Sequence, residues 1–236
     1  MRKLIIYFLA TLSLTLGLVA NATATSFTLA ELNDSNKFII EGDKLFSDFQ
    51  VNLSANGPNT APGDLSGITV SGITLGGNHG LHFTGGLFAG MGSNLDLIIS
   101  YKASVLFTNI TNLQISDVHL IFNGAVTGAG FTNVTETVTT ADGLTVLGQA
   151  QVTNPPPDFD EAILLSQPQS MIRVTKDIFL FGSGNSETPG TATISFIDQV
   201  FSQSRPPQNV PEPASIVLLG TGLLGLARLR RGRRSE

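Results

Sequence analysis

Residues 95–107 read LDLIISYKASVLF, and this stretch decides the fold class of the chain. Its odd positions, from Leu95 to Phe107, are all apolar or aromatic, whereas its even positions include Asp96, Ser100 and Lys102. In an extended strand the odd side chains share one face, whereas a helix would scatter them around its circumference. The pattern therefore predicts a half-buried β-strand over this stretch.

Shorter runs with the same period occur along most of the chain and predict about ten strands in total. These runs are Phe49/Val51/Leu53, Ile68/Val70, Ile73/Leu75, Val118/Leu120/Phe122, Leu144/Val146, Ile172/Val174 and Ile194/Phe196. Clusters of Gly, Asn and Asp separate the runs at spacings typical of antiparallel hairpins. We therefore expect an all-β fold: an antiparallel β-sandwich ectodomain, with an N-terminal signal helix before it and a short C-terminal transmembrane helix after it.

Two segments inside the expected sandwich need a separate interpretation. The Thr-rich stretch 134–140 has a wholly polar odd face, which predicts a solvent-facing strand near the edge of a sheet. Asn154 and the three prolines 155–157 predict a stiff, extended connector. This connector either joins the two sheets or separates a small second subdomain, and we favour a single domain.

The charge of the chain is distributed unevenly. Residues 25–207 contain six basic and 16 acidic residues, a net charge of −10, whereas both ends of the chain are basic. Nucleic-acid affinity depends on clustered Lys and Arg that neutralise phosphates, so this middle region argues against a nucleic-acid partner. The chain has no Cys, which excludes disulfides, zinc–thiolate sites and thiol nucleophiles. Its stability must therefore come from burial.

The N-terminus has the features of an export signal. Arg2 and Lys3 precede the apolar run 4–19, and small residues follow at positions 20–24. Signal peptidase recognises small residues of this kind, so we expect cleavage after Ala24 or, as the second choice, after Ala22. The alternative is an uncleaved N-terminal anchor helix. In both cases the chain is exported.

The C-terminal 27 residues contain three features in a fixed order. Val210-Pro211-Glu212-Pro213 is followed by the uncharged run 214–227 and then by an Arg-rich end. This tail resembles the PEP-CTERM sorting signal of exported bacterial proteins. The resemblance implies that a membrane-embedded, exosortase-like enzyme recognises the motif and cuts near residues 210–213. It also implies a bacterium that makes exopolysaccharide, with matrix polysaccharide or a neighbouring surface protein as a contact.

The physical properties of the tail agree with a short membrane anchor. Its 14 uncharged residues would form a helix of about 21 Å, somewhat less than the hydrocarbon core of about 30 Å. Arg side chains can extend to the interface, and their cluster places that end in the cytoplasm. The residues expected to form this anchor include Ala214, Leu219, Gly222, Leu226, Arg228, Arg230 and Arg231. The alternative is a plain C-terminal membrane anchor that is never cleaved.

These features divide the chain into five parts. We expect a signal peptide at 1–24, the β-sandwich ectodomain at 25–204, a Pro-rich linker with the Pro-Glu-Pro motif at 205–213, a transmembrane helix at 214–229 and an Arg-rich cytoplasmic tail at 230–236.

Few residues of the expected ectodomain suggest chemistry. His79 and His82 are three residues apart, and in a strand this spacing puts them on opposite faces, which disfavours a shared metal. His119 is expected at the surface or edge of a strand. Oxygen-rich acidic clusters can hold Ca²⁺, and the candidate ligands are Asp158, Asp160 and Glu161. The alternative for this cluster is a solvated acidic turn. We expect no other cofactor and no catalytic residues.

The sequence therefore predicts a non-enzymatic exported protein, sorted to the cell surface or the extracellular polysaccharide matrix, with a structural or adhesive role. Its expected partners are signal peptidase, an exosortase-like enzyme, the membrane and exopolysaccharide. Two alternatives remain open. One is a Ca²⁺-dependent carbohydrate-binding module. The other is a secreted hydrolase that uses the three histidines and the acidic residues of 158–161.

Overall fold

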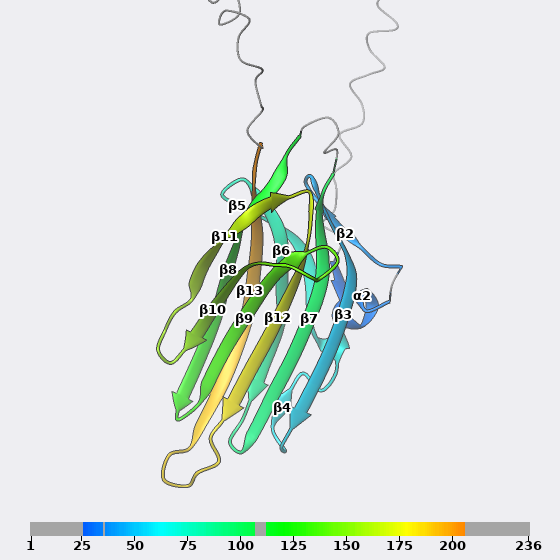
Figure 1. Cartoon of the computed structure of the whole chain (residues 1–236). Coiled ribbons are helices and arrows are strands. Elements are labelled where there is room, and N and C mark those ends of the chain that lie inside the picture. The colour runs from blue at the N-terminus through cyan, green and yellow to red at the C-terminus, as the bar shows by residue number, and fades with distance from the viewer. Residues whose placement is uncertain (1–25, 35, 107–111, 206–236) are drawn as a thin grey trace, which may run out of the picture. The chain divides into compact units, whose positions relative to one another are not determined.

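The computed structural model describes residues 26–34, 36–106 and 112–205. The expected signal helix, transmembrane helix and Arg-rich tail lie outside the described residues. Within them, two antiparallel sheets are stacked face to face, as the sequence predicted (Figure 1). The part of the chain that the structure describes contains no helix long and apolar enough to cross a membrane.

One sheet, called sheet A below, contains seven strands. Its hydrogen-bonded order is β1 (Ser26–Thr28), β5 (Thr69–Leu75), β6 (Asn78–Ala89), β13 (Gly190–Ser204), β8 (Gln114–Gly128) and β11 (Asp160–Gln169), with β4 (Thr60–Ala61) also paired to β6. Every pairing in this sheet is antiparallel.

The other sheet, sheet B, contains six strands, all antiparallel. Their order is β10 (Val146–Asn154), β9 (Phe131–Thr140), β12 (Met171–Gly182), β7 (Ser93–Val105), β3 (Lys44–Asn56) and β2 (Ile39–Glu41). One short helix, α2 (Leu29–Leu32), follows β1, and a single 3₁₀ turn (Leu65–Gly67) precedes β5. The Thr-rich strand is β9, the second strand from the edge of this sheet.

The inner faces of the two sheets form one apolar core. In β7 the odd positions from Leu95 to Val105 are all buried, which confirms the alternation predicted from the sequence. Phe107 lies outside the described residues. The aromatic ring of Tyr101 is at the centre of this core, stacked against Phe49 and edge-on to Phe46. The thirteen strands found in the described residues belong to one compact unit that ends at Ser204.

Bulges change which positions face the core, and here the sequence prediction was partly wrong. In β13 the register shifts between Ile194 and Phe196. Ile194 is buried, but Phe196 lies on the other face, where its ring is 5.7 Å from that of His82. An extra residue in one strand reverses the alternation beyond it. The prediction that Ile194 and Phe196 share a face was therefore wrong.

The run Leu144/Val146 was also misassigned. Both side chains are largely exposed, and β10 begins only at Val146, with a register shift before Gly148. Leu147 is the residue that enters the core. The bulge again explains the difference, because it moves the buried face by one position.

The three prolines 155–157 form a tight turn and not an extended connector. Thr153 and Asp158 exchange two backbone hydrogen bonds across it, at 2.8 and 2.9 Å. The turn leads from β10 in sheet B to β11 in sheet A, so it joins the two sheets at one side of the sandwich.

Candidate functional site

A polar pocket of about 260 Å³ lies at one end of the sandwich, where β3 begins and β13 ends. Residues from both sheets line it: Asp43, Lys44, Gly77, Asn78, His79, Leu113, Phe201 and Gln203. The two hairpin turns 42–43 and 76–77 bring the charged residues to this end. The pocket therefore combines one Lys, one Asp, one His and two amide side chains.

Lys44 is the dominant charge of this pocket. Its side chain is only 2% exposed, and its Nζ donates a hydrogen bond of 2.7 Å to Asp43 Oδ1. Burial lowers the pKa of Lys44, because it penalises the charged ammonium. Burial also acts to raise the pKa of Asp43, but hydrogen bonding and the positive charge of Lys44 outweigh it, so this pKa is lowered. Gln203 faces the same carboxylate, yet its buried Nε2 makes no hydrogen bond of normal geometry.

His79 connects the pocket to the edge of sheet B. The Thr74 hydroxyl donates a hydrogen bond of 2.8 Å to Glu41 Oε1 and lies 3.0 Å from His79 Nδ1. A hydroxyl has one hydrogen, so Nδ1 must be the donor in the second contact. Glu41 Oε1 is 3.7 Å from the same nitrogen. This arrangement fixes the His79 ring and links β2 to β5 and β6.

Two His–Asp pairs lie on the outer face of sheet A. His82 on β6 is directly opposite Asp198 on β13, and their side chains are hydrogen-bonded through Nδ1 and Oδ1. His119 on β8 is hydrogen-bonded through Nε2 to Asp160 on β11. All four residues come from neighbouring strands of this sheet, and the histidines are about one-third exposed. The outer face thus presents two imidazoles that are each held by a carboxylate.

The structure separates His79 from the other two histidines, but it brings His119 together with one of the acidic candidates, Asp160. His79 faces the pocket between the sheets, whereas His82 and His119 lie on the outer face. Asp160 is engaged by His119, the backbone of Asp158 closes the Pro turn, and Glu161 follows on the opposite face of β11. Over residues 26–34, 36–106 and 112–205, no three His, Asp or Glu side chains gather closely enough to hold a metal ion.

Sequence reasoning missed the buried polar side chains, and four of them are Lys44, Glu136, Lys176 and Gln199. A signal for three of these four was present at the period of a strand: Glu136 lies between Val134 and Val138, Lys176 between Val174 and Ile178, and Gln199 between Ile197 and Phe201. The same alternation that predicted apolar faces would have placed these polar side chains inside the core.

Comparison with known proteins identifies the C-terminal tail. Residues 209–234 match the PEP-CTERM protein-sorting motif, so the chain carries this sorting signal, as the resemblance implied. The matched segment lies entirely after the β-sandwich. No curated protein sequence matches the chain.

Several solved structures are similar in part to the chain. The enzymatically active domain of bacteriophage CBA120 tailspike protein 4 has 11% identity and a TM-score of 0.28, over 62% of this chain and 19% of that one. A second similar structure is the family 11 carbohydrate-binding module of Clostridium thermocellum in complex with a mixed-linked tetrasaccharide. It has 8% identity and a TM-score of 0.23, and the match covers 64% of this chain and 87% of that one. A DUF4465 family protein from Bacteroides caccae has 12% identity and a TM-score of 0.22, and the match covers 75% of this chain and 100% of that one.

Proposed function

We propose that this chain is a non-enzymatic exported protein, which its PEP-CTERM signal sorts to the cell surface or the extracellular polysaccharide matrix, where the β-sandwich has a structural or adhesive role. The observation that carries this proposal is the sorting motif at residues 209–234. The basic and apolar N-terminus, with its small residues before position 25, supports export.

The edge of the sandwich supports an adhesive role. At one side of the sandwich the edge strands are β10 of sheet B and β11 of sheet A, and they approach each other at Gly148 and Ile163. Two of the most exposed large apolar side chains of the described residues lie here: Leu164 on β11, at 79%, and Leu144 in the turn before β10, at 83%. Exposed strand edges with apolar side chains are templates for pairing with another chain. We infer that this edge contacts further copies of the chain.

The sorting part of the proposal is tested on protein recovered from the outside of its native cells. The intact mass and the C-terminal peptide are measured by mass spectrometry. We expect a C-terminus within residues 210–213, without the Arg-rich end. A tail intact to Glu236 would contradict processing and would make the protein a simple anchored ectodomain.

The edge contact is tested by light scattering on the same protein and on Leu164→Lys. The wild type should give an oligomeric mass, and the added charge at the strand edge should reduce it toward the monomer. Met91→Lys is the matched control, because Met91 is also exposed, at 54%, but lies in the turn between β6 and β7. A monomeric wild-type mass would contradict self-association.

A second candidate function is a carbohydrate-binding module, and the polar pocket is the observation that favours it. Its Lys, Asp, His and amide groups can donate and accept hydrogen bonds to sugar hydroxyls. Calorimetric titration with neutral oligosaccharides tests this candidate. Binding that is lost in Gln203→Leu but kept in Gln149→Leu, an exposed glutamine on β10, would support it. A rise in melting temperature with Ca²⁺, lost in Asp160→Ala, would support the Ca²⁺-dependent form.

A further inference from the structure

Three polar side chains meet in the middle of the core, and they come from both sheets. Lys176 on β12 is directly opposite Glu136 on the neighbouring strand β9, and Gln199 approaches them from β13 in the facing sheet. The Lys176 Nζ donates hydrogen bonds to Glu136 Oε2 and to Gln199 Oε1. Each of the three residues is fully buried, with an exposed fraction of 0%.

The surroundings of this core cluster, Lys176–Glu136–Gln199, do not fully satisfy its polar groups. Glu136 Oε1 and the hydroxyl of Tyr101 are both buried without a hydrogen-bond partner. Burial, and after it the charge of Glu136, raises the pKa of Tyr101. An ion pair in an apolar core is stabilising only when its remaining lone pairs are satisfied. The cluster is therefore a poor structural ion pair.

The same surroundings favour the neutral form of Lys176. Burial lowers the pKa of Lys176, because a charged ammonium loses its hydration in the core. Transfer of one proton from Lys176 to Glu136 converts both charges into neutral groups, which the core accepts more readily. A neutral lysine amine is a nucleophile.

The electrophile is already in contact with this amine. Gln199 Oε1 accepts the hydrogen bond from Nζ, which places the side-chain carbonyl carbon Cδ next to the amine. On its other side, Gln199 Nε2 donates a hydrogen bond of 3.1 Å to the backbone oxygen of His119. The amide is thus held between the nucleophile and β8. Positioning of this kind removes much of the entropic barrier to a bimolecular reaction.

We propose that Lys176 and Gln199 become joined by an intramolecular isopeptide bond, which cross-links the two sheets through the core, and that Glu136 carries the protons of this reaction. The role of Glu136 follows from its position, because its carboxylate contacts the attacking nitrogen. The inference does not depend on the sorting signal or on the proposed function.

The reaction balances without any added reactant. The neutral amine attacks Cδ of Gln199, a new C–N bond forms, and the carbonyl electron pair moves to Oε1. Glu136, protonated by Lys176 beforehand, delivers that proton to Nε2 and then accepts another from Nζ; the Cδ–Nε2 bond breaks, the carbonyl re-forms and ammonia leaves. The ammonium, the carboxylate and the primary amide become a secondary amide, a protonated Glu136 and ammonia. No electron is transferred.

The product suits the core better than the starting groups do. A neutral amide and a protonated carboxyl group replace two buried charges, which lowers the cost of keeping them away from water. Glu136, once protonated, can also donate a hydrogen bond to the new carbonyl group. The link joins β12 and β13, which follow each other in the chain but belong to different sheets.

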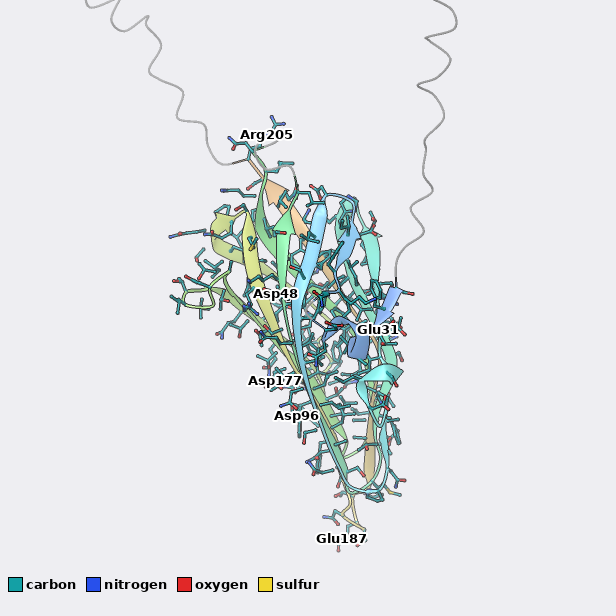
Figure 2. All side chains as sticks on the ribbon, turned by 90° about the vertical axis from the view of Figure 1, so that its right-hand side faces the viewer. Glu31, Asp48, Asp96, Asp177, Glu187 and Arg205 are labelled. Atoms are coloured by element: carbon teal, nitrogen blue, oxygen red, sulfur yellow. The ribbon has the colours of Figure 1, made fainter. Side chains whose placement is uncertain are left out.

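Mass spectrometry of the full chain tests the proposal. A protease that cleaves after glutamate, used in denaturant, separates residues 162–187, which contain Lys176, from the peptide that begins at Thr188 and contains Gln199. Glu187 lies at the tip of the loop between β12 and β13 (Figure 2). We expect the two peptides to stay joined, with a mass lower than their sum by one ammonia molecule. Two separate peptides of unmodified mass would overturn the proposal.

Variants test the role of each residue. Gln199→Met removes the electrophile at nearly constant volume, and we expect full peptide masses and separate peptides. Gln149→Met, at an exposed glutamine of β10, is the matched control, and it should keep the link. Glu136→Met should leave Lys176 and Gln199 unlinked, and a link that forms at the wild-type rate in this variant would overturn the role given to Glu136. The wild-type digest decides the proposal even if a variant does not fold.

Discussion

Lys44 and Lys176 are both buried lysines of sheet B, with exposed fractions of 2% and 0%, yet their surroundings differ. Lys44 begins β3 at the rim of a pocket, and its partner, Asp43, is its neighbour in the chain and is 34% exposed. Lys176 lies in the middle of β12, and its partners come from two other strands and are fully buried.

Burial therefore does not by itself determine what a lysine can do. Water in the pocket can reach Asp43 and solvate Lys44 when its partner is lost. Lys176 is instead fully buried, and within the described residues its nitrogen is hydrogen-bonded to one carboxylate and one amide. Lys44 belongs to the polar pocket at the end of the sandwich, whereas the surroundings of Lys176 favour its reaction with Gln199.

The largest effect is expected at the fully buried cluster around Lys176. Glu136→Ala leaves the buried Lys176 without a carboxylate, and removing one partner of a buried pair typically costs about 3–5 kcal/mol. Urea denaturation monitored by fluorescence or circular dichroism measures the free energy of unfolding. A variant as stable as the wild type would show that water reaches this cluster and would remove the contrast with Lys44.

An intermediate effect is expected at the pocket. Asp43→Ala should cost about 1–2 kcal/mol, because Lys44 loses a charged hydrogen bond but can still be hydrated. The pKa of Asp43 is lowered in the folded state, so its stabilisation is present above its unfolded pKa and is lost as the pH falls through the folded pKa. Thermal melts across acidic pH should show this loss in the wild type and not in the variant. A cost equal to that of Glu136→Ala would contradict the comparison.

The smallest effect is expected next to Lys176, on the opposite face of the same strand. Partial burial and then the charge of Asp96 raise the pKa of Asp177. A carboxyl group whose folded pKa is raised destabilises the fold when ionised and ceases to do so as the pH falls through that pKa. Figure 2 shows Asp96 and Asp177 on one side of the ribbon. Asp177→Asn should therefore raise the melting temperature at neutral pH, by the equivalent of a few tenths of a kcal/mol.

The control for this change is the pH itself. Below the unfolded pKa both the wild type and Asp177→Asn carry a neutral side chain, so their melting temperatures should converge. A difference that persists in acid would assign the effect to something other than the charge of Asp177.

Features that depend only on residues close together in the chain could be predicted from the sequence. The alternation from Leu95 to Val105 and the linear sorting motif could both be identified without a structure, because each depends only on neighbouring residues. The bulge between Ile194 and Phe196 could not be predicted, since it depends on how β13 pairs with β6 and β8. The period-two pattern could have placed Glu136 and Lys176 inside the core. Their meeting with Gln199 depends on the stacking of the two sheets.

The position of β13 has a mechanical consequence. This strand has 15 residues, is hydrogen-bonded on one side to β6 and on the other to β8, and ends at Ser204, where the chain continues into the tail. If the tail tethers the protein, tension enters the domain through this strand and acts along its length. The hydrogen bonds on both sides are then loaded in shear and must fail together, whereas an edge strand would peel away one bond at a time. A tether through the tail would thus be attached at an interior strand of sheet A and not at an edge strand.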